Sequence, residues 1–125
     1  MNSRNLVVCA ALVMAVGVGA GAFGAHALRG LVAADRMPIW QTAVLYQIIH
    51  GLGMLAVALL GMHMPSPRLR LAGGLMLAGI VIFSGSLYTL VLTDTRWLGA
   101  ITPFGGVAFI AAWCLVALAA LDRTP

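Results

Sequence analysis

Two groups of polar side chains stand inside long apolar runs of this sequence, and each group contains a histidine. His26 is followed three residues later by Arg29, while Tyr46 and Gln47 precede His50 by four and three residues. Residues three or four apart share one face of a helix. An imidazole placed in this way can ligate a metal, carry a proton or act as a general base. These residues therefore mark where a chemical site would lie.

Metal or haem chemistry would need more ligands than these. His26 and His50 have the arrangement of a b-type haem pair, two histidines on neighbouring apolar segments. Their expected depths from one membrane face, about 6 Å and about 13 Å, differ by about 7 Å, and nothing else indicates haem. His63, Cys9 and Cys114 lie toward the opposite face. We therefore predict no cofactor and no metal site, with haem at His26 and His50 left as an alternative.

An enzyme would need a nucleophile beside a base. Ser84 or Ser86 with His50 is the one conceivable pair, and no carboxylate lies inside an apolar run to orient the imidazole. We predict no catalytic residue. Arg29 and Tyr88 keep open the alternative of a small membrane enzyme acting on an amphipathic substrate. A transporter or channel is not favoured, because the polar residues stop midway across the membrane.

The composition decides which solvent surrounds these residues. Apolar residues make up 62% of the 125-residue chain and charged residues 8%, with a mean hydropathy of +1.06. A soluble domain has roughly a quarter charged residues, so this chain needs lipid around it. Its seven arginines stand singly between apolar runs rather than clustered on one face. That pattern is typical of charges flanking membrane spans and excludes a nucleic-acid-binding protein.

Four apolar runs are each long enough to cross a bilayer core of ~30 Å. They cover approximately residues 6–28, 42–62, 69–92 and 100–121. The short connections make neighbouring helices antiparallel, so the prediction is all-α: a single membrane domain, residues 1–125, with four transmembrane helices in an up-down bundle. Leu28, Leu31 and Val32 predict a short interfacial helix between the first two spans, ended by Pro38. Trp40 is expected in the headgroup belt.

The polar residues of the spans gather near one membrane face, the face reached by the first and third connections. The other half of each span is mainly Ala, Val, Leu, Ile, Met and Cys. Because lipid offers no hydrogen-bond partner, we expect the polar side chains to point into the bundle and to form a pocket or a hydrogen-bond network. The candidate residues are His26, Arg29, Gln41, Tyr46, Gln47, His50, Ser84, Ser86, Tyr88 and Thr102.

Two features of the sequence allow other interpretations. Arg4, the apolar run after it and Ala25-His26-Ala27 imitate a signal peptide, but the run exceeds the usual ~7–15 residues of such a leader. We therefore expect this segment to be a membrane span. Cys9 and Cys114 are expected to be buried thiols; a disulfide between them is the alternative, and it would need an oxidising environment.

The arginines also bear on orientation. Arg4, Arg68, Arg70 and Arg123, together with the N-terminal amine, lie on one side of the predicted membrane, against three arginines on the other. The excess of positive charge predicts that both termini are cytoplasmic.

Several motifs occur in order along the chain. They are Gly21–His26, Trp40–Thr42 with Tyr46, Gln47 and His50, Phe83–Tyr88, and Thr102-Pro103 with Gly105-Gly106 and Trp113. In these motifs the chain resembles the domain-of-unknown-function family 423, which includes bacterial YgdD-like proteins and animal transmembrane protein 256. The resemblance implies a small four-span protein, in the inner membrane of bacteria, without an established activity.

The polar half of the bundle carries the functional prediction. We expect it to bind a membrane lipid, a small lipophilic ligand or a partner membrane helix. The alternatives are the membrane enzyme above and a purely structural membrane oligomer. Small residues four apart, such as Gly17 and Gly21, let helices touch closely and fit a homo-oligomer or a larger membrane complex as well as packing within the bundle.

Overall fold

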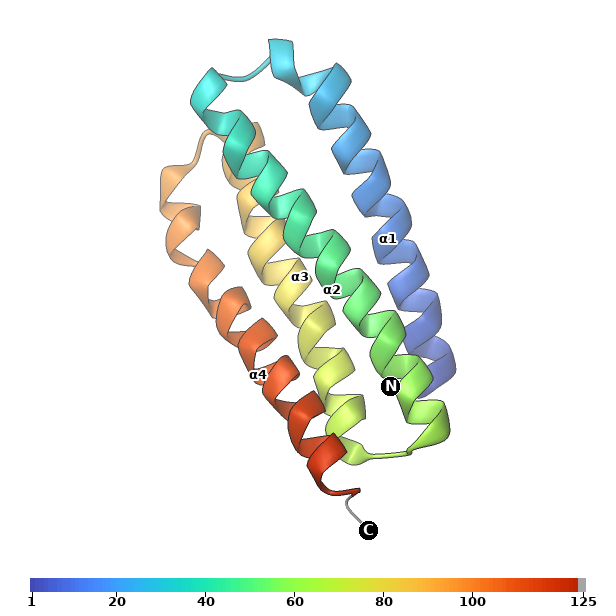
Figure 1. Cartoon of the computed structure of the whole chain (residues 1–125). Helices are drawn as coiled ribbons and strands as arrows, with labels where there is room; N and C mark the ends of the chain where they lie inside the picture. The colour runs from blue at the N-terminus through green and yellow to red at the C-terminus, as the bar shows by residue number, and fades with distance from the viewer. Residues whose placement is uncertain (124–125) are drawn as a thin grey trace.

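A computed structural model describes residues 1–123 as four long antiparallel helices (Figure 1). The helices are α1 (Ser3–His26), α2 (Met37–His63), α3 (Pro67–Thr93) and α4 (Thr102–Leu121). All four are long and apolar enough to cross a membrane. The predicted all-α fold with four membrane helices is confirmed. The last two residues of the predicted domain, 124 and 125, lie outside the described part.

The helices pack in chain order. α1 lies mainly against α2, α2 against α3, and α3 against α4, so α2 and α3 are central and α1 and α4 form the outer sides (Figure 1). Consequently α2 and α3 bury much more of their apolar surface within the protein than the outer helices do. The outer faces of α1 and α4 are left to lipid.

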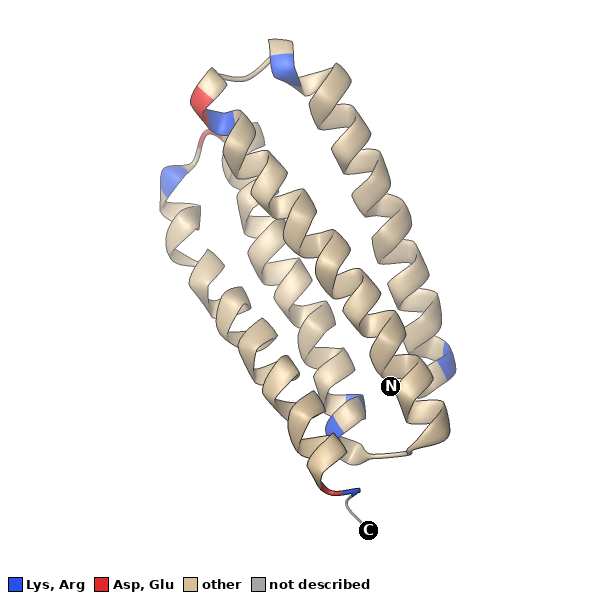
Figure 2. Cartoon of the chain, in the orientation of Figure 1, with Lys and Arg blue, Asp and Glu red and all other residues tan. Residues whose placement is uncertain are grey.

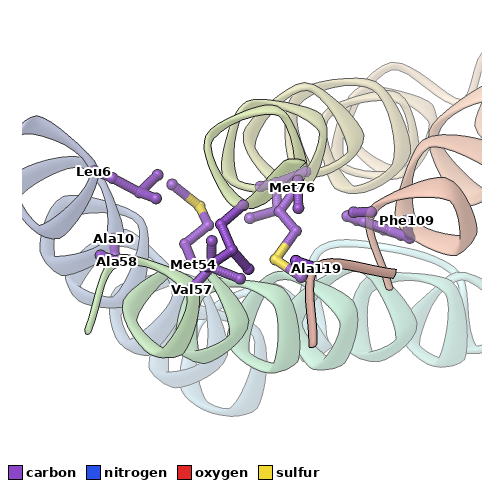
Figure 3. Close-up of a cluster of buried hydrophobic side chains, with 12 residues drawn as sticks. Leu6, Ala10, Met54, Val57, Ala58, Met76, Phe109 and Ala119 are labelled. Atoms are coloured by element: carbon purple, nitrogen blue, oxygen red, sulfur yellow. The ribbon is translucent and has the colours of Figure 1, made fainter. Parts of the chain in front are cut away.

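The larger apolar cluster fills the half of the bundle nearer the termini. Figure 3 shows Met54 and Met76 at its centre, between Leu6 on one side and Phe109 and Ala119 on the other. Unbranched methionines fill irregular gaps between helices well. A second cluster, Leu28, Met37, Trp40, Leu90 and Val91, lies near the first and third connections.

Glycines set the closest helix contact, between α3 and α4. A Cβ added to Gly105 would lie 2.6 Å from the backbone nitrogen of Phe83, and one added to Gly79 would lie 3.1 Å from the carbonyl oxygen of Gly105. No other residue type fits at such a distance without moving a helix. This backbone-to-backbone approach is the usual role of small residues between membrane helices.

Charged residues of the described chain lie only at the two ends of the bundle (Figure 2). At the end away from the termini, the Arg36 Nε donates to Asp94 Oδ1 at 2.9 Å. This hydrogen bond holds the pKa of Asp94 below its usual range, so the carboxylate is ionised at neutral pH. At the opposite end, Arg68 pairs with Asp122. Each ion pair ties together two segments more than fifty residues apart in sequence.

The predicted interfacial helix is wrong. The chain between α1 and α2 instead forms two separate 3₁₀ helices, η1 (Leu28–Gly30) and η2 (Ala34–Arg36). Leu28 is buried against the bundle, whereas Leu31 is 77% exposed, so no continuous apolar face forms. Pro38 does not end a helix; it lies in the first turn of α2, where its missing N–H costs nothing. α2 therefore begins five residues before the predicted span.

Trp40, which is expected in the headgroup belt, turns its ring into the bundle. Its side chain is only 5% exposed and packs inside the second apolar cluster. The early start of α2 explains the difference, because it places Trp40 in the first turn of a helix that faces α1 and α3.

Candidate functional site

The ten predicted site residues separate into a buried set and a surface set. Gln47, His50, Ser84, Ser86 and Thr102 are buried, and Tyr88 is partly buried. His26, Arg29, Gln41 and Tyr46 are exposed. All ten residues therefore lie in the same half of the bundle along its axis, but only six of them are inside it.

Gln47 joins three helices. Its Nε2 donates to the carbonyl oxygen of Val13 on α1 at 2.9 Å, and its Oε1 accepts a hydrogen bond from the Tyr88 hydroxyl on α3 at 2.6 Å. Since Gln47 is on α2, one amide group links α1, α2 and α3. Both of its polar atoms are used.

Trp40, seven residues before Gln47, makes a second hydrogen bond from α2 to α1. Its Nε1 donates to the carbonyl oxygen of Ala20 on α1 at 2.9 Å, and its ring packs against Tyr88 with centroids 4.6 Å apart. In an α-helix the carbonyl of residue i pairs with the N–H of residue i+4. The two carbonyls reached from α2, those of Val13 and Ala20, are thus the helix partners of Gly17 and Gly24.

The two glycines make this access possible. A Cβ on Gly24 would lie 2.6 Å from the Trp40 Cδ1 and Nε1, and one on Gly17 would lie 2.9 Å from Ile48 Cδ1 and 3.5 Å from Gln47 Nε2. At Gly17 and Gly24, a residue larger than glycine would put its Cβ where the α2 side chains now lie. The absence of a Cβ therefore leaves each carbonyl open to a donor from α2. The two carbonyls, the two glycines and the two donors all repeat at seven residues.

His50 faces α4 rather than α1. Its Nδ1 lies 2.8 Å from the carbonyl oxygen of Tyr46, and the indole Nε1 of Trp113 donates to its Nε2 at 3.1 Å. A carbonyl can only accept and an indole N–H can only donate, so these partners select the neutral imidazole with its proton on Nδ1. The ring also stacks on Phe109 with centroids 3.5 Å apart.

Three hydroxyls complete the buried polar set. Ser84 donates to the carbonyl oxygen of Ala43 at 2.7 Å and links α3 to α2. The hydroxyls of Ser86 and Thr102 lie 2.6 Å apart and link α3 to α4. Within residues 1–123, no buried side-chain nitrogen or oxygen lacks a hydrogen-bond partner. This half of the bundle is thus a satisfied network whose side chains fix how the helices meet.

This geometry leaves little reactive chemistry in the network. In the described chain, the serine hydroxyls nearest His50 in depth bond to a carbonyl and to Thr102 instead of the imidazole. Both His50 nitrogens are engaged, because Nδ1 donates its proton to the Tyr46 carbonyl and the lone pair of Nε2 accepts from Trp113. His26 is exposed at the end of α1 and does not join the network. The expectation that all the polar side chains point into the bundle is therefore wrong for His26.

A groove runs beside the network, between α1 and α2, and opens onto the outer surface of the protein. Its volume is about 300 Å³, at the lower end of the range of small-ligand sites. The wall on α2 extends from Met37 to Ile48, which corresponds to roughly 16 Å along the helix axis. The groove thus covers about half of the ~30 Å hydrocarbon core. Its lining residues are Gly21, Gly24, Ala25, Met37, Trp40, Gln41, Val44, Leu45 and Ile48.

The groove is apolar except at one end. Gln41 is the one predicted site residue in its wall, and Ala25 and Met37 line the end near the first connection. Arg29 lies in η1, four residues after Ala25, and is exposed. No carboxylate among residues 1–123 forms an ion pair with Arg29. The chain just beyond the groove residue Ala25 therefore carries an arginine that has no carboxylate partner among residues 1–123.

Two residues important to the network were not among the predicted site residues: Trp40 and Trp113. Each donates its indole N–H inside the bundle. A signal for Trp40 was present in the sequence, since it precedes Gln47 by seven residues as Gly17 precedes Gly24. Trp113 has a weaker signal, a tryptophan near the middle of a membrane span, where its N–H needs a partner.

Comparison with known proteins places this geometry in a wider set. A family described as "Protein of unknown function (DUF423)" matches residues 20–106. The UPF0382 membrane protein SERP0230 of Staphylococcus epidermidis is 48% identical over 118 residues, covering 94% of this chain and 96% of the relative. The UPF0382 membrane protein YwdK of Bacillus subtilis is 45% identical over 119 residues, covering 94% and 97%. No solved structure shows significant similarity.

Proposed function

This chain belongs to the DUF423 family of proteins of unknown function, and from that premise we propose that it is an integral membrane protein that binds a membrane lipid in the groove between α1 and α2. The observation that carries the proposal is the groove itself, a mainly apolar groove between α1 and α2 that opens onto the outer surface of the bundle. A lipid already in the bilayer could enter it from the side without crossing water.

The dimensions of the groove favour an acyl chain of one leaflet as occupant. Its length of roughly 16 Å matches one leaflet's share of the hydrocarbon core. Its deep end is lined by Val44 and Ile48, and its polar residue, Gln41, lies nearer the first connection. This order, apolar inside and polar toward the membrane surface, is the order of groups along a phospholipid.

The hydrogen-bond network supports this function by holding the walls of the groove. Trp40 lines the groove and donates to Ala20 on the facing helix. Gln47 fastens the same two helices one heptad deeper. The separation of α1 and α2, and with it the width of the groove, is therefore fixed by the buried polar residues. In this proposal the hydrogen-bond network has a structural role, because it holds the two helices that form the groove.

Native mass spectrometry of the protein released from lipid nanodiscs tests the proposal. We expect one phospholipid to remain bound per chain. Ala25→Phe would place a ring in the groove, because Ala25 lines it. We expect this variant to retain lipid about tenfold less, a change of roughly 1.4 kcal/mol.

Ala15→Phe is the matched control, since Ala15 is exposed on the same helix and does not line the groove. Equal lipid retention by wild type and Ala25→Phe would contradict the proposal, as would wild type without bound lipid. The same spectra report the number of chains, which tests the predicted homo-oligomer.

A further inference from the structure

We infer that the lipid taken by this groove is a phospholipid whose headgroup carries a net negative charge, and that Arg29 binds its phosphate. This inference rests on the proposed function, since it names the chemical class of lipid for the same site. It starts from the charges at the end of the bundle where the groove meets the membrane surface.

The charges at this end do not balance. Three arginines, Arg29, Arg36 and Arg96, face two aspartates, Asp35 and Asp94. One arginine, Arg36, pairs with both aspartates. The Arg36 Nε and Nη2 donate to Asp94 Oδ1, and Nη1 lies 3.5 Å from Asp35 Oδ2. Arg29 and Arg96 are therefore left without a direct carboxylate partner in the described chain.

Of these two arginines, Arg29 is much the nearer in sequence to a residue that lines the groove. Ala25 lines the groove, and the chain continues from it through Ala27, whose φ of −103° and ψ of −45° keep the right-handed winding into η1. Arg29 therefore follows Ala25 by four residues, beyond the last residue of α1 and within η1, at the end of the bundle where the groove meets the first connection. Arg96, in the connection between α3 and α4, does not line the groove.

A phosphate fits what these residues offer. Arginine donates in a planar fork that binds two phosphate oxygens at once. Gln41 lines the groove one turn into α2, is exposed, and makes no side-chain hydrogen bond that the structure describes. Its amide can donate to the same phosphate or to the ester oxygens below it. If the acyl chain lies beside Val44 and Ile48, the phosphate of the same lipid lies at the level of Gln41 and Arg29.

The expected charge of the headgroup is inferred from the protein, whose arginines at this end exceed its aspartates by one. A zwitterionic lipid brings an ammonium group into a region where three arginines already outnumber two occupied aspartates. That cation has no carboxylate left to pair with, and it is repelled by Arg29 and Arg96. A phosphatidylglycerol-type headgroup supplies the phosphate and no cation, so it complements this end of the bundle.

The test compares two lipids with identical acyl chains, phosphatidylglycerol and phosphatidylcholine, in native mass spectrometry of the whole chain. We expect wild type to retain phosphatidylglycerol about tenfold better. Arg29→Gln should abolish this preference, while Arg96→Gln, which removes the same charge from the same end of the bundle, should keep it. Circular dichroism melting of both variants checks that they fold.

The possible outcomes separate the two proposals. If neither lipid stays bound to wild type, the proposed function fails. If both lipids bind wild type equally and Ala25→Phe releases both, the groove binds lipid but the inference about charge is wrong. Equal loss of preference in Arg29→Gln and Arg96→Gln would show a diffuse surface charge rather than a site at Arg29, and would also overturn the inference.

Discussion

At the scale of single residues, the amide of Gln47 has the largest role. It is buried inside the bundle, and each of its polar atoms has one partner on a different helix, the Val13 carbonyl on α1 and the Tyr88 hydroxyl on α3. A buried polar group without a partner costs more than the hydrogen bond contributes. Removing Gln47 would leave the Tyr88 hydroxyl without this partner, whereas the Val13 carbonyl keeps its bond to the N–H of Gly17 within α1.

We predict that Gln47→Leu lowers the free energy of unfolding by about 1–2 kcal/mol, because two interhelical hydrogen bonds are lost at roughly 0.6 kcal/mol each and the Tyr88 hydroxyl is left without a partner. Equilibrium unfolding in mixed micelles measures the change. Gln41→Leu is the matched control on the same helix, since Gln41 is exposed. An equal effect of both variants would mean that the network does not stabilise the bundle.

Which residues meet inside the bundle could be predicted from the sequence only in part. Depth follows from position along a helix, and this placed Gln47, His50, Ser84, Ser86, Tyr88 and Thr102 in the same half. Rotation about the helix axis does not follow from depth. His26 is two residues after Gly24, which faces Trp40; two residues turn the helix by about 200°, so His26 points to the outer surface.

At the scale of helices, α1 depends on few contacts with the rest of the protein. It packs mainly on α2, and much of its apolar surface faces outward. Its position is fixed by the two carbonyls that accept from Trp40 and Gln47, each uncovered by the glycine one turn later. The glycines of α1 therefore serve to expose backbone oxygens as well as to allow close packing.

The two kinds of glycine on α1 should respond oppositely to alanine. Gly24→Ala places a Cβ 2.6 Å from the Trp40 ring, so the ring must move and its hydrogen bond to Ala20 is strained. We predict a loss of about 1–3 kcal/mol, the usual cost of overpacking. Gly19 has no atom within 4 Å of an added Cβ, so Gly19→Ala should stabilise the helix by roughly 0.5–1 kcal/mol.

Unfolding of both variants in the same micelles measures the difference, and the Trp40 contact would be shown unimportant if Gly24→Ala were as stable as Gly19→Ala.

The approach of Gly24 to Trp40 could not be read from the sequence. Small residues four apart were visible there, but the sequence does not say which glycine meets a side chain and which meets lipid. That depends on which neighbour α1 packs against, and the outer position of α1 is a property of the whole bundle.

At the scale of the whole molecule, the two ends differ in accessible positive charge. Arg4, Arg68, Arg70 and Arg123 lie at one end of the bundle and three arginines at the other (Figure 2). Of those three, Arg36 is only 9% exposed and is bound to Asp94. Arg68 at the opposite end is likewise half-buried and bound to Asp122. The end that carries the groove thus presents two exposed arginines against three, and this excess favours keeping the four-arginine end in the cytoplasm.

This bias predicts that the first connection faces away from the cytoplasm and that both termini face the cytoplasm. Single cysteines test it, in a chain whose Cys9 and Cys114 are replaced by alanine. Ala34→Cys lies on the exposed surface of η2, and His63→Cys on the exposed end of α2 at the opposite face. In intact cells with a permeable outer layer, a membrane-impermeant maleimide should label Ala34→Cys, and should reach His63→Cys only after lysis.

The reverse labelling pattern would place the groove in the cytoplasmic leaflet, and labelling of both cysteines in intact cells would mean insertion in two orientations. Either result would leave the groove and Arg29 in place, because both belong to the end of the bundle and turn over with it. The orientation decides only which leaflet supplies the lipid. With the first connection outside, that lipid must come from the outer leaflet, and the protein would bind anionic phospholipid that has already crossed the membrane.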